Sequence, residues 1–167
     1  MHQFYTLYAR RLSAVCSRYI ANREDQQDVF QSGFVSILTH LSSFSYRGPG
    51  SLEAWALRIM VNEALAFIRK KHQQEWKELD DDIAEEQEAD DPPLSDVPPE
   101  VIHRLIQQLP TGYRTVLNLY VFEDLSHREI ARLLGIRERS SASQLSRAKS
   151  LLGRMIKEYL TQTQTPR

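Results

Sequence analysis

The 167-residue chain has one cysteine, six glycines and no long apolar run. The single cysteine, Cys16, excludes an internal disulfide, and its place on an apolar helical face indicates a buried structural thiol. No stretch approaches the roughly 20 apolar residues that cross a bilayer, and the N-terminus lacks the pattern of a signal peptide. We therefore expect a globular protein located in the cytoplasm.

Residue groupings that support catalysis are also missing. The sequence contains no glycine-rich phosphate loop, no nucleophile elbow, and no paired carboxylates outside one acidic tract. The histidines are scattered without the spacing of metal ligands; they are His2, His40, His72, His103 and His127. We expect no enzyme, no metal site and no cofactor.

The net charge of −1 conceals a strong segregation of charge along the chain. Residues 1–72 hold nine Lys/Arg and five Asp/Glu, residues 73–100 hold one and twelve, and residues 101–167 hold eleven and five. Two basic blocks therefore flank an acidic tract, which fits a phosphate backbone as partner.

The acidic tract separates two helical regions. Its charge repulsion and prolines predict a flexible linker over 73–100, and mimicry of nucleic acid at a basic groove is the alternative role. On both sides the apolar residues follow helical spacing, and no strand-like alternation occurs. We expect an all-α chain of two small domains, at 1–72 and 101–160, followed by a tail at 161–167.

Residues 126–149 predict a helix-turn-helix. Ser126 suits a helix N-cap, Glu129 completes a capping box, and Gly135 suits the end of that helix. The next helix places an apolar stripe opposite small polar and basic residues, a pattern suited to the major groove of DNA. An ordinary pair of packed helices is the simpler alternative.

A second candidate site lies at the break between two predicted helices, in the segment SYRGPGS (45–51). Tyr46 and Arg47 stand beside Gly-Pro-Gly, which favours exposure of both side chains. Aromatic residues interleaved with cations suit single-stranded DNA, because bases stack on rings and cations follow phosphates. Taken alone, the aromatic residues are more often core, and we expect Trp55 to be partly buried.

The two patterns, in this order, resemble the bacterial RNA polymerase sigma factors of the sigma-70 family, extracytoplasmic-function (ECF) class. The N-terminal resemblance rests on REDQQDVFQSGF (23–34) and FSYRGPGSLEAWALRIMVNEALAFIRKK (44–71). The C-terminal resemblance rests on LPTGYRTVLNLYVFEDLSHREIARLLGI (109–136) and SQLSRAK (143–149). It covers all of the chain except the linker and the tail.

The resemblance implies a role for three groups of residues. Those that bind core RNA polymerase are Asp28, Gln31 and Phe34. Those that recognise and melt the −10 element are Phe44, Ser45, Tyr46, Arg47, Trp55, Arg58, Asn62, Arg69, Lys70 and Lys71. Those that contact the −35 element are Arg139, Ser140, Ser143, Gln144, Arg147 and Lys149. The implied partners are the β′ and β subunits of core polymerase, promoter DNA in double-stranded and melted form, and an anti-sigma factor.

The recognition helix departs from the family pattern at two positions. Arg139 stands where members usually carry a small residue, and Ala142 stands where a basic residue is common. The resemblance implies a transcription initiation factor that directs polymerase to promoters. The alternative is a stand-alone helix-turn-helix regulator whose N-terminal domain senses a ligand or dimerises.

Overall fold

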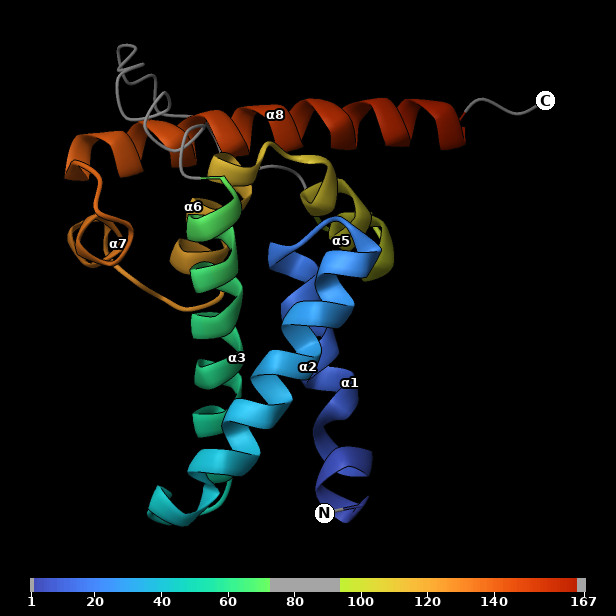
Figure 1. Cartoon of the computed structure of the whole chain (residues 1–167). Helices are drawn as coiled ribbons and strands as arrows, with labels where there is room; N and C mark the ends of the chain where they lie inside the picture. The colour runs from blue at the N-terminus through green and yellow to red at the C-terminus, as the bar shows by residue number, and fades with distance from the viewer. Residues whose placement is uncertain (1, 73–93, 165–167) are drawn as a thin grey trace. The chain divides into compact units, whose positions relative to one another are not determined.

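The computed structural model describes residues 2–72 and 94–164, and every regular element in these ranges is a helix (Figure 1). This confirms the all-α fold. The chain divides into two compact units, Met1–Lys71 and His72–Arg167.

The first unit is a bundle of three long helices. They are α1 (His2–Tyr19), α2 (Arg23–His40) and α3 (Ser51–Lys71), with a short 3-10 turn η1 (Leu41–Ser43) after α2. Helix α3 packs against both α1 and α2. Gly33 of α2 allows a close approach to α3, since a Cβ built there would lie 2.6 Å from the sulfur of Met60. The largest fully buried side chains of this unit are Tyr19, Leu12, Ile37 and Met60.

Polar contacts fix the ends of these helices. Asn22 caps α2, because its side-chain oxygen accepts a hydrogen bond from Asp25 N at 3.0 Å. The last residue of α3, Lys71, donates to Asp25 Oδ2 at 2.5 Å, and Arg11 of α1 forms an ion pair with Glu53 of α3.

The second unit comprises α5 (Pro99–Gln108), α6 (Thr111–Val121), α7 (His127–Leu134) and α8 (Glu138–Gln164). The long α8 packs against each of the other three helices. Its buried stripe of Leu145, Ala148, Leu152 and Ile156 meets a core that includes Val116, Leu119 and Ile130. The stripe follows helical spacing, so α8 is amphipathic along most of its length.

Buried Arg114 on α6 secures the junction with α5. Its Nη1 donates to the carbonyl oxygens of Gln107 at 2.7 Å and Leu109 at 3.1 Å. These carbonyls belong to the end of α5, where no further helical turn follows to supply donors. Burial lowers the pKa of Arg114 by desolvating its charged form.

The predicted boundaries differ from the helix ends by a few residues. Most of the expected linker, residues 73–93, lies outside the described residues. Its last part is ordered, since Val97 is buried and α5 begins at Pro99. Helix α8 continues to Gln164, so the first four residues of the expected tail are helical.

Candidate nucleic-acid interface

A closed turn carries the chain from η1 into α3. Gly48 and Gly50 flank Pro49 and adopt φ angles of 113° and 80°, which L side chains rarely adopt. Ser51 Oγ donates to the carbonyl of Gly48 at 2.7 Å and accepts from Arg47 N at 3.2 Å. These bonds hold the loop backbone against the first turn of α3.

An open pocket of about 400 Å³ lies beside this turn. It is lined by Ser43, Phe44, Ser45, Arg47, Ser51, Ala54, Trp55 and Arg58. The rings of Phe44 and Trp55 are half-buried and contact each other at 5.3 Å between centroids. Tyr46 lies outside this lining and its side chain is 72% exposed, so its ring is available for stacking.

The solvent face of α3 continues from the pocket as a polar stripe. Arg58, Asn62 and Arg69 are exposed and share one face at helical spacing. Ala54 and Ala66, also exposed, lie on the same face and leave room for a large partner between the polar side chains. The structure therefore brings together most of the residues predicted to contact the −10 element.

The two lysines that end α3 are not equivalent. Lys70 is exposed. Lys71 bonds to Asp25 of α2 and lies 5.5 Å from the centre of the Phe67 ring. A phosphate at Lys71 must therefore compete with an ion pair inside the first unit.

The residues predicted to bind core polymerase divide between two surfaces of α2. Asp28 and Gln31 are exposed, whereas Phe34 is half-buried and packs with its ring plane tilted only 13° from that of Phe30. Tyr5 of α1 meets Phe34 edge-on at 5.5 Å. The ring of Phe34 is thus part of an aromatic cluster between α1 and α2.

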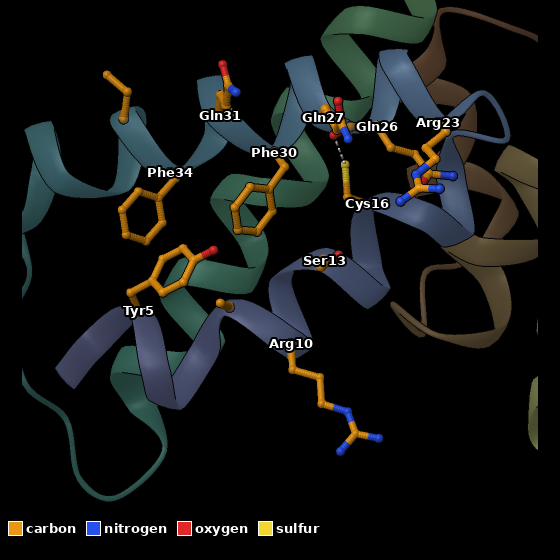
Figure 2. Close-up of a pocket in the computed structure, with 12 residues that line it drawn as sticks. Tyr5, Arg10, Ser13, Cys16, Arg23, Gln26, Gln27, Phe30, Gln31 and Phe34 are labelled. Atoms are coloured by element: carbon orange, nitrogen blue, oxygen red, sulfur yellow. Dashed lines mark hydrogen bonds between the residues drawn. The ribbon is translucent and has the colours of Figure 1, made fainter. Parts of the chain in front are cut away.

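That cluster forms one end of a groove of about 970 Å³ between α1 and α2 (Figure 2). Gln31 lines the groove and so connects it to the exposed face that carries Asp28. Val35, also in the lining, is 61% exposed. Sequence reasoning missed Val35 and Tyr5, because a single apolar residue on a helix gives no signal of exposure until its neighbours are known.

The first helix of the predicted helix-turn-helix has the expected ends. Ser126 Oγ accepts from Glu129 N at 3.3 Å, and Glu129 Oε2 accepts from Ser126 N at 2.8 Å, which completes the capping box. Hydrogen bonds from Ser126 lower the pKa of Glu129 because they stabilise its carboxylate. Gly135 ends α7 with a φ of 68°.

An aromatic and polar contact joins α6, α7 and α8. The ring of Tyr120 stacks on His127 at 4.9 Å between centroids. His127 Nδ1 lies 3.0 Å from Ser141 Oγ, which is fully buried. Ser141 therefore connects the start of α8 to the start of α7.

The residues predicted to contact the −35 element differ in accessibility. Arg139 is exposed, and Arg147 and Lys149 are half-buried. Ser140, Ser143 and Gln144 are buried, with exposed fractions of 1%, 5% and 3%. The burial of Gln144 follows from helix geometry, because Gln144 lies only about 60° around α8 from Ser141, which is itself fully buried. Both polar atoms of the Gln144 amide are buried and have no hydrogen-bond partner among residues 2–72 and 94–164.

Within residues 2–72 and 94–164, no three His, Cys, Asp or Glu side chains gather in a way that could hold a metal ion. No helix of these ranges combines the length and the hydropathy needed to cross a membrane.

Comparison with known families gives two matches in the order of the two units. The family described as Sigma-70 region 2 matches residues 4–74, and the family described as Sigma-70, region 4 matches residues 100–152.

Individual relatives match over most of the chain. RNA polymerase sigma factor SigV of Bacillus subtilis is 29% identical over 140 residues, which covers 80% of this chain and 77% of SigV. RNA polymerase sigma-H factor of Pseudomonas aeruginosa is 25% identical over 164 residues, which covers 92% of this chain and 84% of the sigma-H factor. Among solved structures, the sigma factor RpoE of Bartonella quintana, in complex with the anti-sigma factor NepR, matches with a TM-score of 0.53 and 20% identity. That match covers 93% of this chain and 96% of the other and shows a likeness of fold.

Proposed function

Because the chain belongs to the sigma-70 family of transcription initiation factors and is related to its ECF members, we propose that it grips promoter DNA at two points. Residues 1–72, which include the first unit, act as domain 2, and residues 101–160, within the second unit, act as domain 4. The observation that supports this best is the surface formed by the loop 44–50 and α3, where aromatic rings and cations lie together.

Melting of the −10 element is assigned to this surface. Tyr46 offers an exposed ring for an unpaired base, and Arg58, Asn62 and Arg69 follow the strand along α3. The pocket beside Phe44 and Trp55 holds a base turned out of the strand. Base flipping requires a cavity that replaces the lost stacking, and the aromatic wall supplies it.

Binding to core polymerase is assigned to α2. Asp28 and Gln31 present exposed polar groups to the β′ subunit. The adjoining groove, with Phe34, supplies apolar surface next to these groups. The β subunit is proposed as the partner of the second unit.

The −35 element is assigned to α7 and α8. Arg139, Arg147 and Lys149 supply cations on α8 for phosphate or guanine. Ser140, Ser143 and Gln144 remain predicted contacts that require their side chains to become accessible on the complex. Arg139 and Ala142 depart from the family pattern, and they allow this chain to prefer a different −35 sequence.

The alternative function, a stand-alone regulator, has less support in this chain. A sensing domain has no need of a loop with aromatic and basic side chains next to a docking helix, and family membership covers both units. We further propose that the protein has no catalytic activity of its own, acts in the cytoplasm beside polymerase, and is restrained by an anti-sigma factor.

The deciding experiment is transcription in vitro with purified core polymerase and fragments of the native genome. We expect the full chain to co-elute with core and to direct initiation at a discrete set of promoters. If it does neither, the proposed function is wrong. Sequencing the transcripts places the start sites and hence the −10 and −35 regions.

Variants then separate the assigned surfaces. Asp28→Ala with Gln31→Ala should weaken core binding at least tenfold, while Ser42→Ala, an exposed change outside α2, should leave it unchanged. Tyr46→Ala should reduce permanganate reactivity of the −10 region more than it reduces closed-complex formation. Equal loss of both signals would remove Tyr46 from the melting step.

A further inference from the structure

Helix α8 continues well beyond the part of the chain that matches a known family. The match to Sigma-70, region 4 ends at residue 152, whereas α8 is a single straight helix that continues to Gln164 (Figure 1). Its 27 residues correspond to a length of about 40 Å, and about three turns of the helix follow residue 152. None of the residues assigned above to the −35 element lies in these last turns.

Four cations form a stripe along α8. At 100° per residue, Arg147, Arg154 and Lys157 lie within about 80° of Arg139 around the helix axis. The buried Leu152 lies on the opposite side of the helix. From Arg139 to Lys157 the stripe rises about 27 Å along the axis. The cationic face of the recognition helix therefore extends into the turns beyond the family match.

Arg154 and Lys157 form the accessible end of this stripe. Both are exposed, and neither takes part in a salt bridge among the described residues. By contrast, Arg147 is half-buried, and Ser143 on the same face is buried. The last turn of α8 contains no basic residue, so Arg154 and Lys157 lie too far from the helix end to interact strongly with the helix dipole. Their charges are therefore available to a partner of the second unit.

The length of α8 limits how it can lie on DNA. The major groove is about 12 Å wide and winds around the duplex, so a straight helix of about 40 Å leaves the groove at one end. In helix-turn-helix proteins the N-terminal residues of the recognition helix contact the base edges. The C-terminal half of such a helix therefore crosses the phosphate backbone beside the groove.

We infer, on the basis of the proposed function, that Arg154 and Lys157 bind DNA phosphates next to the −35 element. Both side chains donate charge-assisted hydrogen bonds to phosphate oxygens. Contacts of this kind position a protein on the duplex and do not read its sequence. They compensate for Ala142, which stands where a basic residue is common in the family. Arg154 and Lys157 thus supply cations one to two turns beyond the family match.

The first test locates the phosphates. Holoenzyme is assembled from the full chain and core polymerase on a promoter identified by transcription in vitro, and ethylation interference maps the phosphates whose modification prevents binding. For the wild type we expect interference at phosphates next to the −35 element, outside the base pairs that specify it. The double variant Arg154→Gln with Lys157→Gln should lose interference at those phosphates and keep it elsewhere. An unchanged pattern in the double variant would overturn the inference.

The second test measures affinity over a KCl series. The double variant should bind this promoter about 3- to 50-fold less tightly at 0.1 M KCl, and the slope of log K against log[KCl] should become shallower by about 1.8, the contribution of two phosphate contacts. The preferred −35 sequence should stay the same. The exposed Glu158 follows Arg154 by one turn, so Glu158→Gln should increase affinity by removing a charge that repels phosphate.

The matched control is Arg104→Gln with Arg132→Gln, which removes two exposed cations from α5 and α7. It should keep the wild-type interference pattern and most of the affinity. If the two double variants behave alike, the general charge of the second unit explains the effect and the inference is wrong.

An acidic protein surface is the alternative partner for Arg154 and Lys157. In that case their double variant would lose affinity for core polymerase, or transcription that depends on another protein, while the interference pattern and the salt dependence stay as in the wild type. That result overturns the inference while the proposed function stands. Absence of any promoter complex with wild-type holoenzyme would instead contradict the proposed function.

Discussion

Lys71 Nζ lies 2.5 Å from Asp25 Oδ2, so that the last residue of α3 is bonded to the first turn of α2. The side chain of Lys71 is 49% exposed and that of Asp25 is 19% exposed. An ion pair this open to solvent contributes about 0–1 kcal/mol. It is therefore weak enough for DNA phosphate to displace, and strong enough to reduce the affinity of Lys71 for that phosphate.

Asp25→Asn should strengthen promoter binding by holoenzyme, because Lys71 no longer has a competing carboxylate. We expect a two- to fivefold gain, which corresponds to the upper range of a surface pair. The slope of a plot of log K for promoter binding against log[KCl] should become steeper by about 0.7–0.9. This is the contribution of one additional phosphate contact. Filter binding over a KCl series measures both quantities.

The matched control is Glu24→Gln, which removes the same charge from an exposed neighbour in the first turn of α2. It should change affinity less than Asp25→Asn does. If the two variants behave alike, general charge explains the effect and the pair with Lys71 does not.

Arg114→Met should destabilise the second unit by about 2–4 kcal/mol. The substitution leaves the part-buried carbonyl of Gln107 and the buried carbonyl of Leu109 without their donor, and each orphaned acceptor costs about 1–3 kcal/mol. Hydrogen exchange of the full chain, resolved by peptide, should show faster exchange in α5 and α6 and unchanged rates in α1–α3. The exposed Arg104 on α5 provides the control, since Arg104→Met should leave exchange unchanged.

Features encoded by neighbouring residues could be predicted from the sequence. The capping box of Ser126 and Glu129 and the left-handed Gly135 formed as predicted, because each depends on residues within one turn. The all-α fold was predicted for the same reason, since helical periodicity is local. The loop between α2 and α3 was also predictable, because Gly-Pro-Gly cannot continue a helix.

Features that depend on distant contacts could not be predicted. Lys71 and Asp25 are 46 residues apart, and their pairing follows from the packing of α3 on α2. Phe34 shares a sequence motif with Asp28, yet it lies about 120° around α2 from Asp28 and packs into the aromatic cluster. The burial of Ser143 and Gln144 is likewise invisible in the sequence, where both look like polar surface residues.

Acidification should destabilise α7 through Glu129. Its pKa is lowered in the folded chain, so its stabilising effect is complete above the unfolded pKa and is lost as the pH falls through the folded value. Exchange in α7 should therefore accelerate between neutral pH and about pH 3, relative to Glu129→Gln. Glutamine keeps an acceptor for the Ser126 N–H but does not titrate. An identical pH dependence of exchange in both proteins would show that Glu129 does not determine the stability of α7.

Gln144→Leu should stabilise the free protein and weaken its binding to the −35 element. The amide of Gln144 is buried, and neither of its polar atoms has a partner in the part of the chain that the structure describes. This costs about 1–3 kcal/mol, which leucine of similar volume would recover. The amide can also form two hydrogen bonds with adenine, so its loss should reduce protection of the −35 region. Denaturant unfolding and footprinting with holoenzyme measure the two effects. Ser150→Ala, at an exposed position of α8, should alter neither. Higher stability with an unchanged footprint would show that Gln144 is only a poorly packed core residue, and lower stability would show that its amide is satisfied in solution.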